Sequence, residues 1–330
     1  MALSNTYSPT PNVTTVTGSS VGNREDLSDV LTILAPEDTP VTSLCAKASA
    51  NSTFHEWTVD ELATPNADGI NEGSDVTSFT DKFAGRARLG NYTQKFRRDY
   101  LVSDLQEAVT SVGPANIAQA QAKGMREIKR DIELSLCSNS DRQAEDGSGS
   151  SPYKSRGLGD WIDSAGPSDV PAAYRTPSGS IITSALTESS LNDSLGSIYS
   201  KTGEMGNLTL VANVALRKVI ANFTRLEGTT TATSYNVNEP AGDKKVTLSV
   251  SLFDSDFGMV KIVNANPACM PAAETNEGYI LDPKYLGVGT LIPMGNTRLE
   301  NKGGGERGFV DCAATLVCNS PLAHGKIAYS

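Results

Sequence analysis

The stretch PANIAQAQAKGMREIKRDIELSLC, residues 114–137, is the longest helical pattern in the chain, and the other segments can be described by how they lead into or away from it. Its apolar and amide side chains recur at steps of three and four residues: Ile117, Gln121, Met125, Ile128 and Ile132. This spacing places them on one stripe of a helix. Pro114 suits the first turn, where a backbone N–H has no partner within the helix. The pattern predicts one long amphipathic helix.

Charged residues occupy the rest of this helix surface. We expect Met125, Ile128 and Ile132 to be buried within the subunit. Three basic residues are expected to face outward: Arg126, Lys129 and Arg130. Lys129 and Glu133 stand four residues apart, which predicts a modest ion pair along the helix.

Composition limits the classes of function. The chain has 330 residues, a formal net charge of -10 and a pI near 4.8. Its length allows two domains. A protein that coats nucleic acid by neutralising phosphates needs clustered lysines and arginines, so the acidic balance argues against that class. The five cysteines are odd in number and scattered, which favours buried thiols in a reducing compartment over a disulfide framework.

Neither a membrane span nor a secretory route is expected. No segment approaches the roughly 18 consecutive apolar residues that a membrane helix needs. Residues 1–23 carry no charged side chain and lack the basic start and apolar middle of a signal peptide.

The N-terminal region changes character twice. Residues 1–23 are polar and without an apolar period, as in a segment that does not fold alone. Residues 24–34, REDLSDVLTIL, then predict a short amphipathic helix that needs a surface to dock on, its own or a neighbour's. Its apolar stripe consists of Leu27, Val30, Leu31 and Leu34. Residues 35–44 follow as an expected extended connector, because the residues before Pro36 and Pro40 favour extended backbone.

Residues 52–60 and 86–98 read as two strands that flank a polar tip at 61–85, which predicts a long hairpin. Its charges are segregated. The first block has only acids: Asp60, Glu61, Asp68, Glu72, Asp75 and Asp81. The second has only bases: Lys82, Arg86, Arg88, Lys95, Arg97 and Arg98. Two interpretations remain open: a solvated loop whose halves partly face each other, or an arm that meets complementary charge on neighbouring subunits.

The middle of the chain predicts a surface loop followed by a small α+β unit. Residues 138–169 are rich in glycine, serine and mixed charges, with Trp161 and Ile162 expected to return to a core. Thr187 is the expected N-cap of a helix that ends at Gly203 or Gly206. The expected buried stripe of this helix is Leu191, Leu195, Ile198 and Tyr199. A strand at 207–212, a helix at 214–223 and a strand pair within 244–265 follow.

The C-terminal region predicts four strands, at 278–283, 284–293, 308–318 and 324–330. Turns are expected at Asp282, at Gly295 and at the glycine run 303–305. We expect these strands to form a sheet against which the long helix lies.

Residues that could carry chemistry are few. His55 and His324 are the two histidines, and neither stands in a metal-binding or nucleophile motif, so a structural or exposed role is favoured. Cys312 and Cys318 share a face of one expected strand about 20 Å apart, too far for a shared zinc ion or disulfide. The glycine-rich run at 303–308 precedes a strand and predicts a hairpin turn, not a phosphate-binding loop. No metal, cofactor or catalytic residue is therefore predicted.

Five segments together resemble the major capsid proteins of tailed double-stranded DNA phages, which have the Hong Kong 97-type fold, and in particular the podovirus branch. The segments are DVLTILAPEDTPVTSL (29–44), STFHEWTVDEL (52–62), KGMREIKRDIELSL (123–136), GYILDPKYLGV (278–288) and ATLVCNSPLAHGKI (314–327). The resemblance implies an α+β fold divided into an N-terminal arm (1–50), an E-loop hairpin (51–100), a peripheral domain with the spine helix (101–180), an axial domain (181–277) and a return to the peripheral domain (278–330).

The resemblance also implies a function without catalysis. Such proteins assemble into pentamers and hexamers of an icosahedral head around double-stranded DNA, with a scaffolding protein, a portal and an optional decoration protein as partners. They are components of the virion and are made in the cytoplasm of the bacterial host. We expect the charged hairpin residues to contact neighbouring subunits: Asp68, Glu72, Asp75, Asp81, Arg86, Arg88, Arg97 and Arg98. The rival readings are a shell protein of a bacterial encapsulated compartment and a soluble hydrolase.

Overall fold

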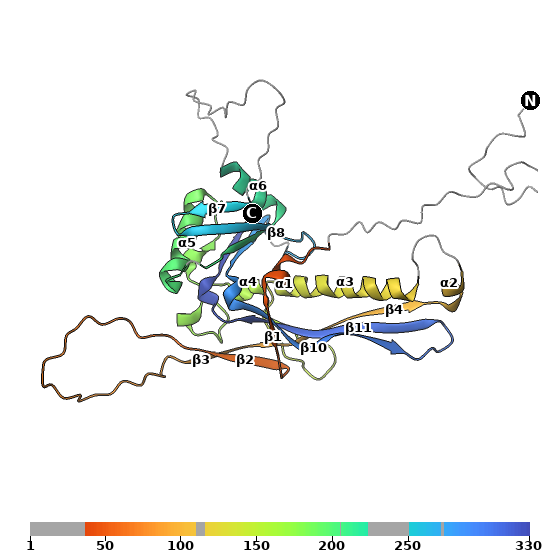
Figure 1. Cartoon of the computed structure of the whole chain (residues 1–330), viewed down its shortest axis with the longest axis horizontal. Helices are drawn as coiled ribbons and strands as arrows, with labels where there is room; N and C mark the ends of the chain where they lie inside the picture. Colours follow the sequence, from red (N-terminus) through yellow and green to blue (C-terminus); the bar gives the residue numbers. More distant parts are fainter. Residues whose placement is uncertain (1–36, 110–115, 205, 224–250, 272–273) are drawn as a thin grey trace, which may run out of the picture.

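The computed structural model describes residues 37–109, 116–204, 206–223, 251–271 and 274–330 (Figure 1). The predicted helix at 24–34, the first-turn position of Pro114 and the first part of the strand pair, 244–250, lie outside these ranges. Strands and helices are both abundant, as the α+β prediction requires.

Two larger sheets and one hairpin make up the β structure. In the four-stranded sheet, called the long sheet below, the order is β1 (Ala46–Ser49), β10 (Leu286–Leu299), β11 (Glu306–Cys318) and β4 (Gln94–Val102). In the six-stranded sheet, called the compact sheet, the order is β5 (Ile181–Ile182), β12 (Gly325–Tyr329), β9 (Asn276–Leu281), β6 (Thr209–Ala212), β8 (Gly258–Asn264) and β7 (Leu252–Ser255). The hairpin pairs β2 (Phe54–Val59) with β3 (Ala87–Tyr92).

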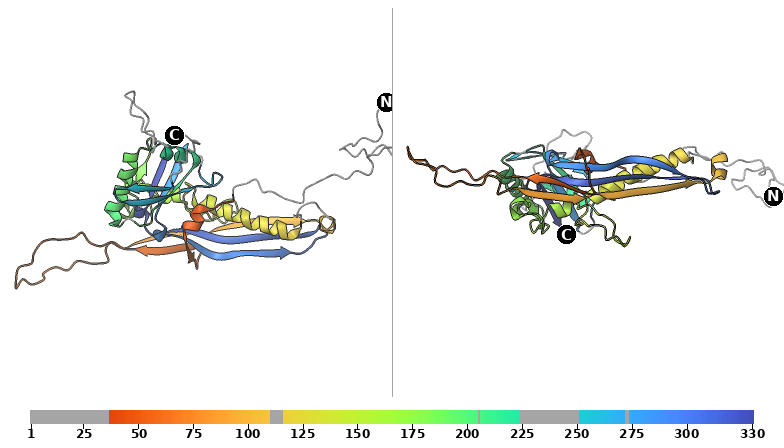
Figure 2. Two further views of the ribbon diagram at one scale, coloured as in Figure 1. Left: turned by 45° about the horizontal axis from the view of Figure 1, so that its top comes forward. Right: turned by 90° about the horizontal axis from the view of Figure 1, so that it is seen from below.

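The helices differ widely in length. The α-helices are α1 (Pro40–Leu44), α2 (Asp104–Ala108), α3 (Ile117–Leu136), α4 (Leu158–Trp161), α5 (Glu188–Thr202) and α6 (Val214–Phe223). Helix α3 is the predicted long helix, and the side chain of Asn116 caps it by accepting from the N–H of Gln119. It lies along the long sheet over β4 and β11, and the two further views show the same arrangement (Figure 2).

The buried face of α3 is rotated from the predicted stripe. Ile128 and Ile132 are buried as expected, but Met125 is 38 % exposed, so its predicted burial is wrong. Gly124 is buried in its place and faces Val310 of β11. Arg126 and Lys129 are exposed as expected, whereas Arg130 is half-buried.

Glu133 is buried instead of paired with Lys129. Its carboxylate accepts hydrogen bonds from the N–H groups of Val41 and Thr42 at 2.8 and 2.7 Å, and from the Thr42 hydroxyl at 2.6 Å. These N–H groups belong to the first turn of α1, where a helix has no internal acceptors. The expected extended connector therefore folds into a helix at Pro40–Leu44, since a residue distant in sequence caps it.

The four C-terminal strands exist, but they do not form one sheet. β10 and β11 build the long sheet beside the helix, while β9 and β12 pair with each other in the compact sheet. An apolar strand pattern in the sequence does not show which other strand it will pair with, so the division between the two sheets could not be predicted from it. The expected turn at Gly295 is also wrong, because β10 runs through it with shifts of register against β11 at Thr290–Gly295.

Two cores result. One surrounds α5 and α6 on one face of the compact sheet, and the other lies between α3, α4 and the long sheet. Trp161 and Ile162 are buried in the second core, as predicted. Thr187 caps α5 in a reciprocal capping box with Ser190, and Gly203 ends it in the left-handed conformation. Tyr199, predicted to be buried, is 43 % exposed and stacks on Phe257.

Candidate intersubunit surface

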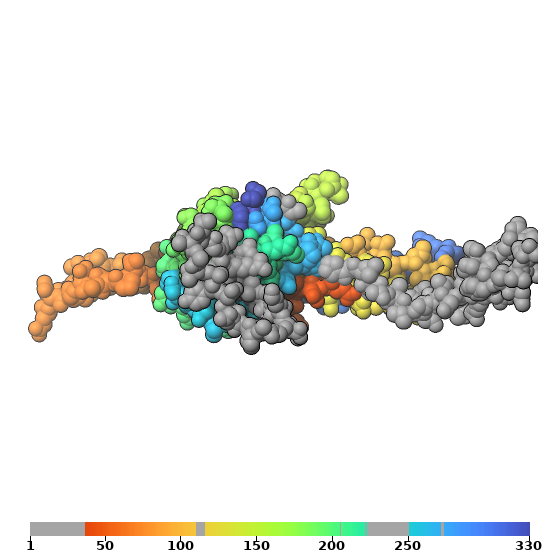
Figure 3. Space-filling model, turned by 90° about the horizontal axis from the view of Figure 1, so that it is seen from above, coloured from red at the N-terminus to blue at the C-terminus, as the bar shows by residue number. Residues whose placement is uncertain are grey.

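The hairpin β2–β3 and its tip, residues 54–92, form an arm: the paired strands pack against the core that contains α3 and α4, and the tip, residues 60–86, projects beyond it (Figure 1). The space-filling view shows the arm extending alone from one end of the molecule (Figure 3). Gly90 lies opposite Glu56 in the hairpin, and a Cβ there would lie 2.7 Å from the Phe54 ring. Glycine therefore lets the Phe54 ring cover the strand and stack at 4.7 Å on Tyr92.

The base of the arm is held firmly to the body. The buried Asn91 amide donates to Ser155, to the Arg156 carbonyl and to the Leu316 carbonyl, and its oxygen accepts from the N–H of Arg156 at 2.8 Å. Because every polar atom of this side chain has a partner, its burial is stabilising. Trp57 packs against Trp161 with ring centres 5.7 Å apart.

A cluster of ion pairs supports the same base. Arg156 is 1 % exposed at its side chain and contacts the carboxylates of Asp141, Asp169 and Asp160 at 2.6, 2.7 and 2.9 Å. Burial, followed by the nearby charge of Asp141, raises the pKa of Asp160 to about 6. Arg142 joins the cluster by pairing with Asp169. It also donates to the Gly90 carbonyl, which links the cluster to β3.

Beyond this base the arm is covered by no other part of the described chain. The Tyr174 hydroxyl donates a hydrogen bond to the carbonyl of Gly85, where the tip joins the hairpin. Past that point large apolar side chains stand in solvent: Leu62 (97 %), Ile70 (88 %), Val76 (71 %), Phe79 (90 %) and Phe83 (61 %). The sequence predicted a polar tip and missed these apolar side chains, because they do not recur at a regular spacing. A stretch of this kind indicates a surface that another molecule covers.

The predicted acidic residues all lie on this uncovered part. Asp68, Glu72, Asp75 and Asp81 are exposed and make no ion pair within the described part of the chain. Asp81 is engaged only locally, since its carboxylate accepts from the N–H of Phe83.

The predicted basic residues separate into paired and available ones. Arg86 pairs with Asp60 at 2.8 Å and lies over the Phe83 ring, and Arg88 lies 3.7 Å from Glu56, so both halves of the arm do partly face each other. Arg97 is exposed in β4, stacks over Phe309 at 5.9 Å and has no ion pair in the described ranges.

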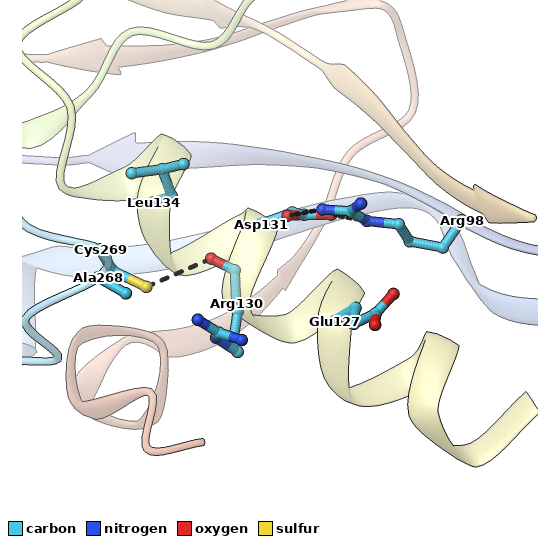
Figure 4. Close-up of a pocket in the computed structure, with 7 residues that line it drawn as sticks. All are labelled: Arg98, Glu127, Arg130, Asp131, Leu134, Ala268 and Cys269. Carbon is cyan, nitrogen blue, oxygen red and sulfur yellow. Dashed lines mark hydrogen bonds and ion pairs between the residues drawn. The ribbon is translucent and has the colours of Figure 1, made fainter. Parts of the chain in front are cut away.

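Arg98 forms an ion pair within its own subunit. Its guanidinium binds both carboxylate oxygens of Asp131 on α3, at 2.6 and 2.7 Å (Figure 4). This bidentate pair joins β4 to the helix. Hydrogen bonding to Asp131, followed by its charge, raises the pKa of Arg98. Arg98 therefore differs from Arg97 although the two are adjacent, because successive residues of a strand point to opposite faces.

The histidines and cysteines, which are common catalytic residues, are mostly buried in this chain. His324 is fully buried, its Nδ1 accepts from the N–H of Asp282, and burial lowers its pKa to about 3. His55 lies in β2 beside Trp57. All five cysteines are buried free thiols. Within the residues described, no group of three or more His, Cys, Asp or Glu could hold a metal ion, and no helix has the length and apolarity to cross a membrane.

Comparison with known proteins identifies the family. Residues 10–329 match the family described as SU10 major capsid protein. The chain belongs to this family. A curated relative, the major capsid protein of Escherichia phage Phieco32, is 32 % identical over 124 residues, which is 37 % of this chain and about a third (34 %) of that protein. The family match does not favour the two rival readings, an encapsulated-compartment shell and a hydrolase.

Solved phage capsids share the fold of this major capsid protein. The capsid of cyanophage P-SCSP1u has 13 % sequence identity and a TM-score of 0.60, covering 98 % of both chains. A structure from Mycobacterium phage Bobi has 13 % identity and a TM-score of 0.61, covering 94 % of this chain and 98 % of that one. These similarities confirm the Hong Kong 97-type α+β fold.

Proposed function

We propose that this capsid protein assembles into the pentamers and hexamers of an icosahedral phage head that encloses double-stranded DNA without reading its sequence. The observation that supports this proposal best is the arm, whose apolar and charged side chains are left uncovered by the described part of their own subunit. One arm that touches several neighbours makes many weak contacts act together, so that the closed lattice is stable.

In this proposal the parts of the chain have separate roles. The unit around the long sheet and α3 is the peripheral domain, and the unit around the compact sheet is the axial domain near the capsomer symmetry axes. If the compact sheet is one unit, the axial domain also includes β9 and β12, which extends it beyond the predicted boundary at 277. Scaffolding protein and portal guide assembly in the host cytoplasm, a decoration protein is optional, and the chain has no catalytic role.

The net charge of -10 suits this role. A shell wall rich in unpaired cations would bind DNA phosphates and release their counterions, which would hold the DNA in place. An acidic wall confines DNA and leaves it able to move during packaging and release.

Electron microscopy of the purified full chain tests the assembly proposal. We expect negative-stain images, taken with and without co-expressed scaffolding protein, to show discrete closed particles of uniform diameter. A chain that stays monomeric under both conditions at high concentration contradicts the proposal.

A charge reversal tests the contact between the acidic tip and the basic strand. We expect Arg97→Glu to leave the subunit folded and to raise the concentration needed for assembly about tenfold or more at low ionic strength, because like charges then oppose each other at the contact. The second reversal Asp75→Lys in the same chain should restore part of the assembly. Light scattering across a salt series measures both effects.

Two variants control this experiment. Lys218→Glu makes the same charge change on the exposed side of α6 and should assemble as the unaltered chain does. Arg98→Glu should instead destabilise the isolated subunit, since it places a carboxylate against Asp131. If Arg97→Glu assembles normally at every salt concentration, the charged contact does not exist, although the shell itself can still form.

A further inference from the structure

A groove of about 480 Å³ lies beside the long helix, between α1, α3 and the long sheet. Its floor is apolar: Ile132 comes from α3, Val288 and Met294 from β10, and Cys312 and Ala314 from β11. Polar side chains of α1 and the residue before it, among them Thr39 and Thr42, form one wall.

The groove continues into an apolar strip that the described chain leaves open. β1 pairs with β10 only as far as Thr290, and beyond that residue Ile292 and Met294 are exposed. On the helix side, Met125 is exposed one turn before Lys129 and two turns before Ile132, and these two residues line the groove. Met125, which the sequence pattern predicted to be buried within the subunit, is thus exposed beside this groove.

Two cations stand at the groove. Lys47 of β1 and Lys129 of α3 line it, and none of the described residues in its lining carries a carboxylate. Lys129 has no ion pair in the part of the chain described, because its expected partner Glu133 is turned toward α1. The groove therefore suits an apolar segment that carries acidic groups.

Residues 24–34 of the same chain have this chemistry. Their apolar stripe is Leu27, Val30, Leu31 and Leu34, and their charged residues are Arg24, Glu25, Asp26 and Asp29. The segment is therefore acidic overall, and a stripe of this kind is stable only when another surface covers it.

The described chain begins next to the groove. Glu37 pairs with Arg126 on α3 at 3.3 Å, and Thr39 lines the groove itself. Leu34 is five residues before Thr39, a reach of at most about 18 Å for extended chain. A helix formed by residues 24–34 would be about 16 Å long. The segment can thus reach the groove of its own subunit, and the short connection gives it a high effective concentration there.

We propose that residues 24–34 dock as an amphipathic helix in this groove of their own subunit, with the stripe on Met294 and Ile132 and the acids beside Lys47 and Lys129. The docked segment covers the exposed part of α3 and β10. The proposal does not depend on shell formation, because the contact lies within one chain.

Photocrosslinking of the unassembled full chain tests this contact. A benzophenone amino acid replaces Met294, and a mixture of isotopically heavy and light chains is irradiated and analysed by peptide mass spectrometry. We expect crosslinks to residues 24–34 that join heavy to heavy and light to light. The same probe at Met259, exposed in β8 of the compact sheet, should not reach this segment.

Matched variants test the chemistry. Leu31→Asp should lower the crosslink yield about tenfold, the factor expected when one buried leucine is lost. Thr32→Asp adds the same charge off the stripe and should leave the yield nearly unchanged, while Lys129→Glu should reduce it. Mixed heavy–light crosslinks would show that a second copy occupies the groove and would overturn the proposal. So would crosslinks from Met294 only to other segments, or equal yields from the two aspartate variants.

Discussion

Replacement of Glu133 by alanine is expected to lower the free energy of unfolding of the subunit by about 4 kcal/mol, since buried N–H groups that lose their acceptor cost roughly 1–3 kcal/mol each. Glu133 is 1 % exposed and accepts from two N–H groups of α1 and one hydroxyl. Val41, whose N–H is one of these donors, is fully buried, so water cannot replace the carboxylate there without opening the structure. Urea unfolding of the unassembled fraction measures the loss.

Two further substitutions make this result specific. Glu133→Gln keeps one oxygen and the shape of the side chain, so we expect it to lose about half as much stability. Glu127→Ala removes a half-buried partner of Lys123 from the same helix, at an N–O distance of 4.0 Å, and should change stability by less than about 0.5 kcal/mol. A Glu133→Ala subunit as stable as the Glu127→Ala subunit would show that the carboxylate does not hold α1.

Acidification is expected to destabilise the subunit through His324. Burial lowers the pKa of this fully buried imidazole from 6.5 to about 3. Between these two values the unfolded chain binds a proton that the folded chain does not, so stability falls as pH falls through this window. From pH 7 to pH 5 the contribution of this residue is a loss of about 2 kcal/mol.

The variant His324→Asn isolates this contribution. Its amide oxygen can accept from the N–H of Asp282, as Nδ1 does, but it does not titrate. We expect the variant to be less stable at pH 7, because a smaller side chain leaves a cavity, and to lose about 2 kcal/mol less than the unaltered chain on going to pH 5. The difference between the two chains removes the effect of carboxyl groups such as Asp160, whose raised pKa acts in the opposite direction. Parallel pH profiles for both chains would refute the role of His324.

The location of the charged arm, but not the use of each charge, could be predicted from the sequence. The strand-like segments at 52–60 and 86–98 predicted the hairpin, but only Ala87–Tyr92 of the second segment pairs with β2, and the rest belongs to β4 of the long sheet. Which arginines remain available depends on partners far away in sequence. Arg98 finds Asp131 on α3, whereas Arg97, one residue earlier, points away from the helix. Whether the available charges meet another subunit stays a prediction.

Local physical rules account for the elements that the sequence determined by itself. The long helix, the N-cap at Thr187, the left-handed end at Gly203 and the four C-terminal strands depend on periodicity and backbone geometry within a few residues, so the chain specifies them without knowledge of the fold. Tertiary structure alone decided the rest. It turned Glu133 inward to cap α1, because two unpaired N–H groups needed an acceptor. It left Met125 exposed and turned Gly124 toward β11, and it divided the C-terminal strands between two sheets. These outcomes depend on which surfaces meet across long distances in the chain, where hydrogen bonding and close packing outweigh local preference.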